Sequence, residues 1–170
     1  MLKTALTLAV LTLSAPTAQA QTQADILAAR LLPGFVTDHG TRMAGLEMAF
    51  APGWKTYWRA PGDAGIPPVF DWTGSQNVKA VRLHWPRPSV FHLNGLQSVG
   101  YHDALVLPLE VEPLDPAQPV ALRMRVDLGV CKDICMPATL DLSADLTRVA
   151  AMRPSARRWP ISRSAPDRPV

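Results

Sequence analysis

Cysteine is scarce in this chain of 170 residues, which contains only two, and the scarcity narrows the possible functions. Two cysteines fall short of the four ligands of a usual structural zinc site. The sequence also lacks a nucleophile-elbow serine (Gly-x-Ser-x-Gly), a His-Glu-x-x-His pair and a glycine-rich phosphate-binding loop. Hydrolase and nucleotide-binding functions therefore have no support.

Long apolar runs and helical periodicity are missing as well. No segment after the first 20 residues approaches the roughly 18 apolar residues of a membrane-spanning helix. No apolar pattern of helical period extends beyond about two turns. The sequence therefore does not predict a helical protein, an alternating βαβ fold or a membrane-spanning domain.

The first 20 residues have the pattern of a secretory signal peptide. Lys3 gives a positively charged start, residues 5–13 form an apolar run, and residues 18–20 form a small-x-small cleavage site before Gln21. The apolar run is too short for a permanent membrane anchor. We therefore expect a cleaved signal and export to an oxidising compartment, where a disulfide can persist.

Charge is distributed unevenly along the rest of the chain. Residues 21–146 contain 10 Lys and Arg against 13 Asp and Glu, whereas residues 147–170 contain 6 Arg and one Asp. The expected domain therefore has no basic face for nucleic acid. Four prolines and the loss of alternation predict a disordered basic tail over residues 147–170. Such a tail is either a solvated end or a contact for acidic lipid headgroups or a partner.

Alternation of apolar and polar residues predicts seven or eight short strands separated by proline and glycine turns. Pro33-Gly34 and Asn94-Gly95 predict turns, and Pro108 suggests an edge position or a bulge. Strands of this number and spacing predict an all-β domain, an immunoglobulin-like β-sandwich over residues 21–146. The expected strands are residues 30–32, 44–50, 54–59, 69–72, 81–85, 105–111, 120–130 and 140–146.

The two cysteines, Cys131 and Cys135, directly follow the longest alternating pattern. A disulfide between them would close a very short loop, which contributes about 2 kcal/mol in the chain-entropy model, against nearly 5 for a loop of about a hundred residues. Such a pair is a weak staple but opens and closes without unfolding, which suits thiol–disulfide exchange. A purely structural clip is the alternative. Lys132 favours a neighbouring thiolate and Asp133 opposes it, so the sequence leaves the nucleophile open.

Aromatic and histidine residues supply two further candidates. Most aromatic residues of the first half are expected to pack in the core, while one or two could shield the sulfurs. His92 and His102 flank the Asn94-Gly95 turn, so a copper(I) site that joins them to Cys131 and Cys135 is an alternative, because thiolate and imidazole suit that ion.

Four segments together resemble one protein family. They are residues 51–59 (APGWKTYWR), 61–68 (PGDAGIPP), 99–101 (VGY) and 130–137 (VCKDICMP). The stretch 31–146 is similar to the N-terminal periplasmic domain of the thiol:disulfide interchange protein DsbD and its relatives in copper-sensitivity suppressor proteins. The resemblance implies an immunoglobulin-like sandwich in the periplasm, with a redox-active pair at Cys131 and Cys135.

The resemblance also implies partners and neighbouring site residues. The partners would be a membrane electron carrier of the DsbD type and periplasmic thioredoxin-like proteins. Residues 91–96, from Phe91 to Leu96, fall near the mobile loop that caps the cysteines in the family, and Tyr57 falls near the aromatic residues beside them. The cysteine spacing matches the copper-suppressor branch and is narrower than in the best-known DsbD members. This chain carries neither a membrane domain nor a thioredoxin-like domain, so we expect a separate electron donor, a truncated chain or loss of the relay role.

We therefore predict a periplasmic protein that carries reducing equivalents by thiol–disulfide exchange, with protein-disulfide reductase activity if the pair is redox-active and with no cofactor. One cysteine thiolate would attack a partner's disulfide, and the other would resolve the mixed disulfide. Two alternatives stay open. The same cysteines could handle copper(I), or they could clip an interaction domain.

Overall fold

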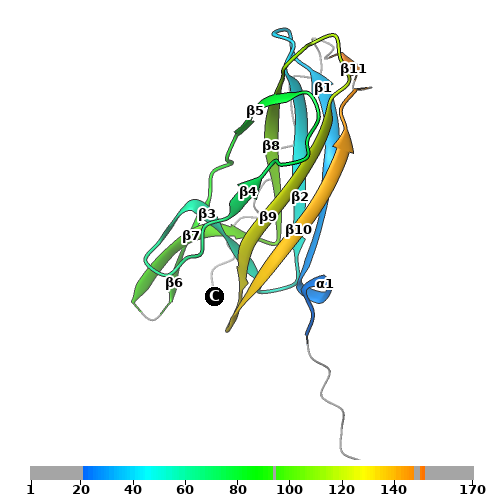
Figure 1. Ribbon diagram of the computed structural model, residues 1–170. Helices are drawn as coiled ribbons and strands as arrows, with labels where there is room; N and C mark the ends of the chain where they lie inside the picture. The colour runs from blue at the N-terminus through cyan, green and yellow to red at the C-terminus, as the bar shows by residue number, and fades with distance from the viewer. Residues whose placement is uncertain (1–20, 94, 148–149, 152–170) are drawn as a thin grey trace, which may run out of the picture.

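The computed structural model describes residues 21–93, 95–147 and 150–151, and nearly all regular structure in them is β (Figure 1). One short helix precedes the strands. The elements are α1 (Gln23–Ile26), β1 (Leu27–Val36), β2 (Arg42–Phe50), β3 (Lys55–Gly62), β4 (Val69–Asp71), β5 (Val78–Leu83), β6 (Ser89–Leu93), β7 (Leu96–His102), β8 (Ala104–Pro113), β9 (Ala121–Cys131), β10 (Cys135–Asp145) and β11 (Ala150–Ala151).

The strands form two sheets that pack as an immunoglobulin-like β-sandwich, as the sequence predicted. The first sheet has the order β11-β1-β2-β8-β5, and the second has the order β10-β9-β3-β7-β6. Strand β3 pairs with β9 only where Lys55 and Thr56 lie opposite Cys131 and Val130, and β4 pairs with β9 farther along. On this side, β9 therefore pairs first with β4 and then, close to Cys131, with β3.

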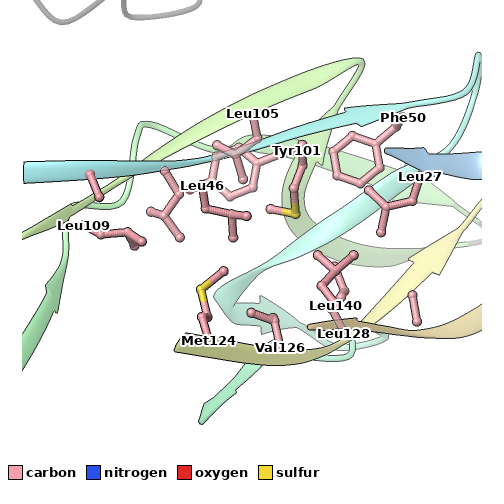
Figure 2. Close-up of a cluster of buried hydrophobic side chains, with 14 of the residues drawn as sticks. Leu27, Leu46, Phe50, Tyr101, Leu105, Leu109, Met124, Val126, Leu128 and Leu140 are labelled. Carbon is pink, nitrogen blue, oxygen red and sulfur yellow. The ribbon is translucent and has the colours of Figure 1, made fainter. Parts of the chain in front are cut away.

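The core lies between the sheets because alternate residues of the long strands point inward. Figure 2 shows the arrangement, with Leu46, Leu105 and Leu109 of the first sheet facing Met124, Val126 and Leu128 of the second. Leu46, Leu107 and Leu109 are fully buried. The alternation read from the sequence therefore identified the inward faces of β2, β8 and β9 correctly.

Strand β1 corrects one prediction. It runs through Pro33-Gly34, where a turn was expected, and pairs with β2 on both sides of that dipeptide. The register shifts between Pro33 and Val36, so an irregularity in the ladder accommodates the proline without ending the strand. The described residues contain eleven strands, rather than seven or eight, because β6, β7 and β11 were not on the expected list, whereas the short strand β4 was predicted at residues 69–72.

Pro108 was expected at a sheet edge or a bulge, yet β8 lies between β2 and β5. Its carbonyl accepts a hydrogen bond from the His84 N–H (2.9 Å), one residue beyond the end of β5. In an antiparallel strand the N–H and C=O of one residue point the same way. An N–H at position 108 would therefore point toward residues beyond the end of β5. Proline breaks no hydrogen bond of the β5–β8 pairing there, and the position is a local edge of the sheet.

A β-hairpin stands where Asn94-Gly95 predicted a turn, and the two predicted terminal segments lie largely outside the described residues. Strands β6 and β7 form the hairpin, with Gly95 at a positive φ of 78°, while Asn94 lies outside the described residues. The predicted signal peptide and residues 148–149 and 152–170 of the predicted tail lie outside them too. Two residues of that tail, Ala150–Ala151, form β11 and pair in parallel with β1. Within the described ranges, the structure contains no helix with the length and apolarity to cross a membrane.

Replacing Leu107 with alanine should destabilise the protein by about 2–5 kcal/mol, because its side chain is fully buried and its loss leaves a cavity. Urea denaturation measures the change. Leu114, which is 67% exposed just after β8, is the matched control, and Leu114→Ala should change the stability by less than about 0.5 kcal/mol. Equal effects of the two substitutions would contradict the assigned core.

Candidate redox site

The two cysteines form a disulfide that closes the β9–β10 hairpin. Cys131 is the last residue of β9, Cys135 is the first residue of β10, and the two are register partners with their Cα atoms 4.1 Å apart. The connecting residues are Lys132, Asp133 and Ile134, and the Lys132 N–H donates to the Ile134 carbonyl (2.9 Å). The structure thus brings together the pair on which the sequence prediction centred.

Strand alternation places both sulfurs on the outer face of the second sheet. Along β9 the even-numbered residues are buried in the core, while Arg123, Arg125 and Asp127 point outward and are exposed. Cys131 continues this outward series, and its partner Cys135 shares the face. Even so, Cys131 is only 2% exposed, whereas Cys135 is exposed. The disulfide therefore has one covered and one accessible end.

Tyr57 contacts the accessible end. Its hydroxyl lies 3.8 Å from the Cys135 Sγ, and because a disulfide sulfur carries no proton, the hydroxyl is the donor. Burial raises the pKa of Tyr57 above its usual value, so the hydroxyl stays protonated throughout the neutral range. A protonated phenol at this position can donate to the disulfide sulfur or to a thiolate formed from it.

Phe91, one end of the predicted cap, lies on β6 and contacts Lys55 of β3 and His102 of β7. The ammonium of Lys55, which is the β3 partner of Cys131, lies 4.5 Å from the centre of the Phe91 ring. That ring packs edge to face with His102 (5.8 Å between ring centres). A shallow groove lies between Phe91 and the residues of the cysteine turn, Lys132 and Asp133.

Leu96, the other end of the predicted cap, pairs with Leu93 at the turn of the β6–β7 hairpin and is half exposed. The hairpin therefore borders the groove beside the cysteine turn, and a capping role for residues 91–96 stays a prediction.

The predicted copper ligands do not assemble. His92 and His102 both line the groove, but His102 Nδ1 bonds to the Asp103 carboxylate (2.7 Å). Across the part of the chain that the structure describes, no three His, Cys, Asp or Glu side chains gather in a group that could hold a metal ion. His92 and His102 therefore do not complete a ligand set with the two cysteines.

The sequence analysis missed one part of the site, residues 62–66, because it used the segment 61–68 only for the family resemblance and gave it no role beside the cysteines. These residues contact β7, Tyr57 and Gly129 on the outer face of the second sheet. The available signal was the density of glycine and proline in PGDAGIPP, which marks close backbone approaches as well as turns.

Comparisons with known proteins bear on the family. The family model of the N-terminal domain of the thiol:disulfide interchange protein DsbD matches residues 23–147. The N-terminal periplasmic domain of ScsB from Proteus mirabilis is 33% identical with a TM-score of 0.61, and the alignment covers 75% of this chain and 49% of that one. This chain thus spans about half the length of the ScsB structure.

A looser likeness links the chain to the reduced N-terminal domain of DsbD from Neisseria meningitidis. It has 12% identity and a TM-score of 0.39, and covers 70% of this chain and 83% of that one, which is too weak to carry an argument. No curated protein matches the chain. The family model and the ScsB similarity agree with the resemblance of the cysteine segment. The chain therefore belongs to the family of DsbD N-terminal domains.

Proposed function

We propose that this protein exchanges the Cys131–Cys135 disulfide with partner proteins in the periplasm and so carries reducing equivalents between them. The observation that carries the proposal is the unequal exposure of the two cysteines, one buried and one accessible. A structural clip gains nothing from this arrangement, whereas an exchanging pair needs one sulfur that a partner can reach and a second that is protected until it resolves the intermediate. Family membership supports the same chemistry.

The exposure also assigns the roles. During reduction, a partner thiolate bonds to the Cys135 sulfur, the bond between the two sulfurs breaks, and the electron pair stays on the Cys131 sulfur, which takes up a proton. A second partner thiolate then attacks the partner's sulfur in the mixed disulfide and releases Cys135. In the opposite direction, the Cys135 thiolate attacks a partner's disulfide and Cys131 resolves the product. Tyr57 donates to Cys135 whenever that sulfur is negatively charged.

The partners follow from the same chemistry. Proteins that give or take two electrons through a dithiol are required on both sides, and we propose a membrane electron carrier of the DsbD type and periplasmic thioredoxin-like proteins. Ile134 in the cysteine turn is 64% exposed. An exposed apolar side chain beside the accessible sulfur gives such a partner a surface to pack against.

Equilibration with glutathione redox buffers tests the exchange. We expect the pair to change from fully oxidised to fully reduced within the range that such buffers reach, because the loop it closes contributes little stability to the disulfide. Alkylation of free thiols followed by mass measurement gives the reduced fraction at each poise. The Cys131→Ser/Cys135→Ser double variant is the blank.

A pair that stays oxidised at the most reducing poise, or never reacts, would rule out the carrier role. Copper(I) handling by the same cysteines is the alternative from the sequence. Tight one-to-one copper(I) binding by the reduced protein, combined with absence of exchange, would favour that alternative over the carrier role.

Substituting Tyr57 with phenylalanine tests the hydroxyl contact. In a Cys131→Ser background, we expect the pH dependence of Cys135 alkylation to move to higher pH by roughly half a unit to one unit, because the thiolate loses a donor. The alkylation rate measured from pH 5 to pH 11 gives the midpoint. Tyr101→Phe is the matched control, since the Tyr101 hydroxyl bonds to the Pro86 carbonyl. Equal midpoints for the two variants would remove Tyr57 from the mechanism.

A further inference from the structure

Residues 62–66, which we name the bridge, connect three strands of the second sheet across its outer face. The first attachment is to β7. The Asp63 N–H donates to the Gln97 carbonyl (2.9 Å), and the Gln97 N–H donates weakly to the Asp63 carboxylate (3.4 Å). Gly62 has a φ of +82°, and a Cβ there would lie 2.6 Å from the Gln97 carbonyl oxygen, so this attachment requires glycine. The bridge is therefore tied to the β6–β7 hairpin.

The second attachment is to Tyr57 on β3. A Cβ on Gly65 would lie 2.8 Å from Tyr57 Cδ1 and 2.2 Å from Pro61 Cβ. The backbone of the bridge at Gly65 therefore packs against the phenol ring with no room for a side chain between them. Strand β9 lies between β3 and β10, yet the Tyr57 hydroxyl reaches Cys135 on β10. The ring must therefore pass over the outer face of β9, beside Cys131.

The third attachment is to Gly129 on β9. A Cβ at Gly129 would lie 2.9 Å from Ile66 Cβ and 3.0 Å from Ile66 Cδ1, so Ile66 occupies the place of the missing side chain. Gly129 lies two residues before Cys131 on β9, so it shares the outward face with that cysteine. The register in which Thr56 pairs with Val130 places Gly129 opposite Tyr57. The space left at Gly129 is thus occupied by Ile66, two residues from the buried Cys131.

We propose that Ile66 is a positioning residue that determines which sulfur of the disulfide a thiol can attack. The proposal rests on the proposed exchange function and deepens it. Ile66 fixes the bridge at Gly129, and the bridge holds the Tyr57 ring across β9 through Gly65. In this proposal the ring and the bridge together cover Cys131 and leave Cys135 open. Ile66 is 46% exposed, so its inner side packs on Gly129 and its outer side faces an approaching partner. Access, and not the chemistry of the two sulfurs, sets the choice.

Attack by reduced glutathione on the oxidised protein reports this choice. The glutathione thiolate sulfur bonds to one cysteine sulfur, the protein disulfide breaks, and the electron pair remains on the other cysteine sulfur, which takes up a proton or is captured by N-ethylmaleimide. Trypsin then separates the two cysteines, because it cleaves after Arg125, Lys132 and Arg148. Mass spectrometry of the two peptides gives the share of glutathione on each cysteine.

For the unaltered protein, we expect glutathione on Cys135 to exceed that on Cys131 by about tenfold or more. Ile66→Ala should raise the share on Cys131 at least about threefold, because the ring is then free to leave its place over β9. Ile66→Val, which keeps the branched Cβ against Gly129, should retain the selectivity of the unaltered protein. Val69→Ala is the matched control, since Val69 is an exposed apolar residue on the adjoining strand β4.

Thermal unfolding of each variant separates access from stability. Ile66→Ala and Val69→Ala should unfold at similar temperatures and differ in the cysteine ratio. An unchanged ratio in Ile66→Ala, with exchange still occurring, would overturn the positioning role alone. A ratio near one between glutathione on Cys135 and glutathione on Cys131 in the unaltered protein would also overturn the positioning role. Absence of glutathione on both cysteines would overturn the proposed function and this inference with it.

Discussion

The register of the β9–β10 hairpin is the constraint on which the site depends. Antiparallel pairing sets Cys131 directly opposite Cys135, and strand alternation turns both sulfurs away from the core. A shift of one residue would turn every side chain of the shifted strand to the opposite face. The inward residues of β9 and β10 fix this register, because Leu128 and Leu140 must enter the core between the sheets. The same packing that folds the domain therefore presents the disulfide at its surface.

The disulfide contributes little to the fold that holds it. The core is formed by residues of both sheets, and breaking one bond at the end of a hairpin removes none of their packing. The site can thus change oxidation state while the scaffold stays in place. The parts that distinguish the two sulfurs come from elsewhere in the chain, with Tyr57 from β3 and Ile66 from the bridge. Chemistry and selectivity are therefore supplied by separate segments.

Much of the fold could be predicted from the sequence because long strands leave a strong alternating signal. This held for β2, β8 and β9, whereas the β6–β7 hairpin was indicated only by its Asn94-Gly95 turn. Pro33-Gly34 was misread because the local signal for a turn was outweighed by pairing of β1 with β2 on both sides of it. The cysteine pair was found from spacing, but the burial of Cys131 was not, since it depends on residues far away in the chain. Gly129 gave no sign of its role, because an absent side chain matters only beside Ile66.

The most direct test of a one-sided exchange uses the two single-cysteine variants against a protein disulfide. The partner is a thioredoxin-like protein with its resolving cysteine replaced and its remaining cysteine carrying thionitrobenzoate. The attacking thiolate bonds to the partner's sulfur and expels coloured thionitrobenzoate, so absorbance gives the rate. The account predicts rapid release with Cys131→Ser, which retains the accessible Cys135, and slow release with Cys135→Ser. Equal rates, or faster release with Cys135→Ser, would contradict it.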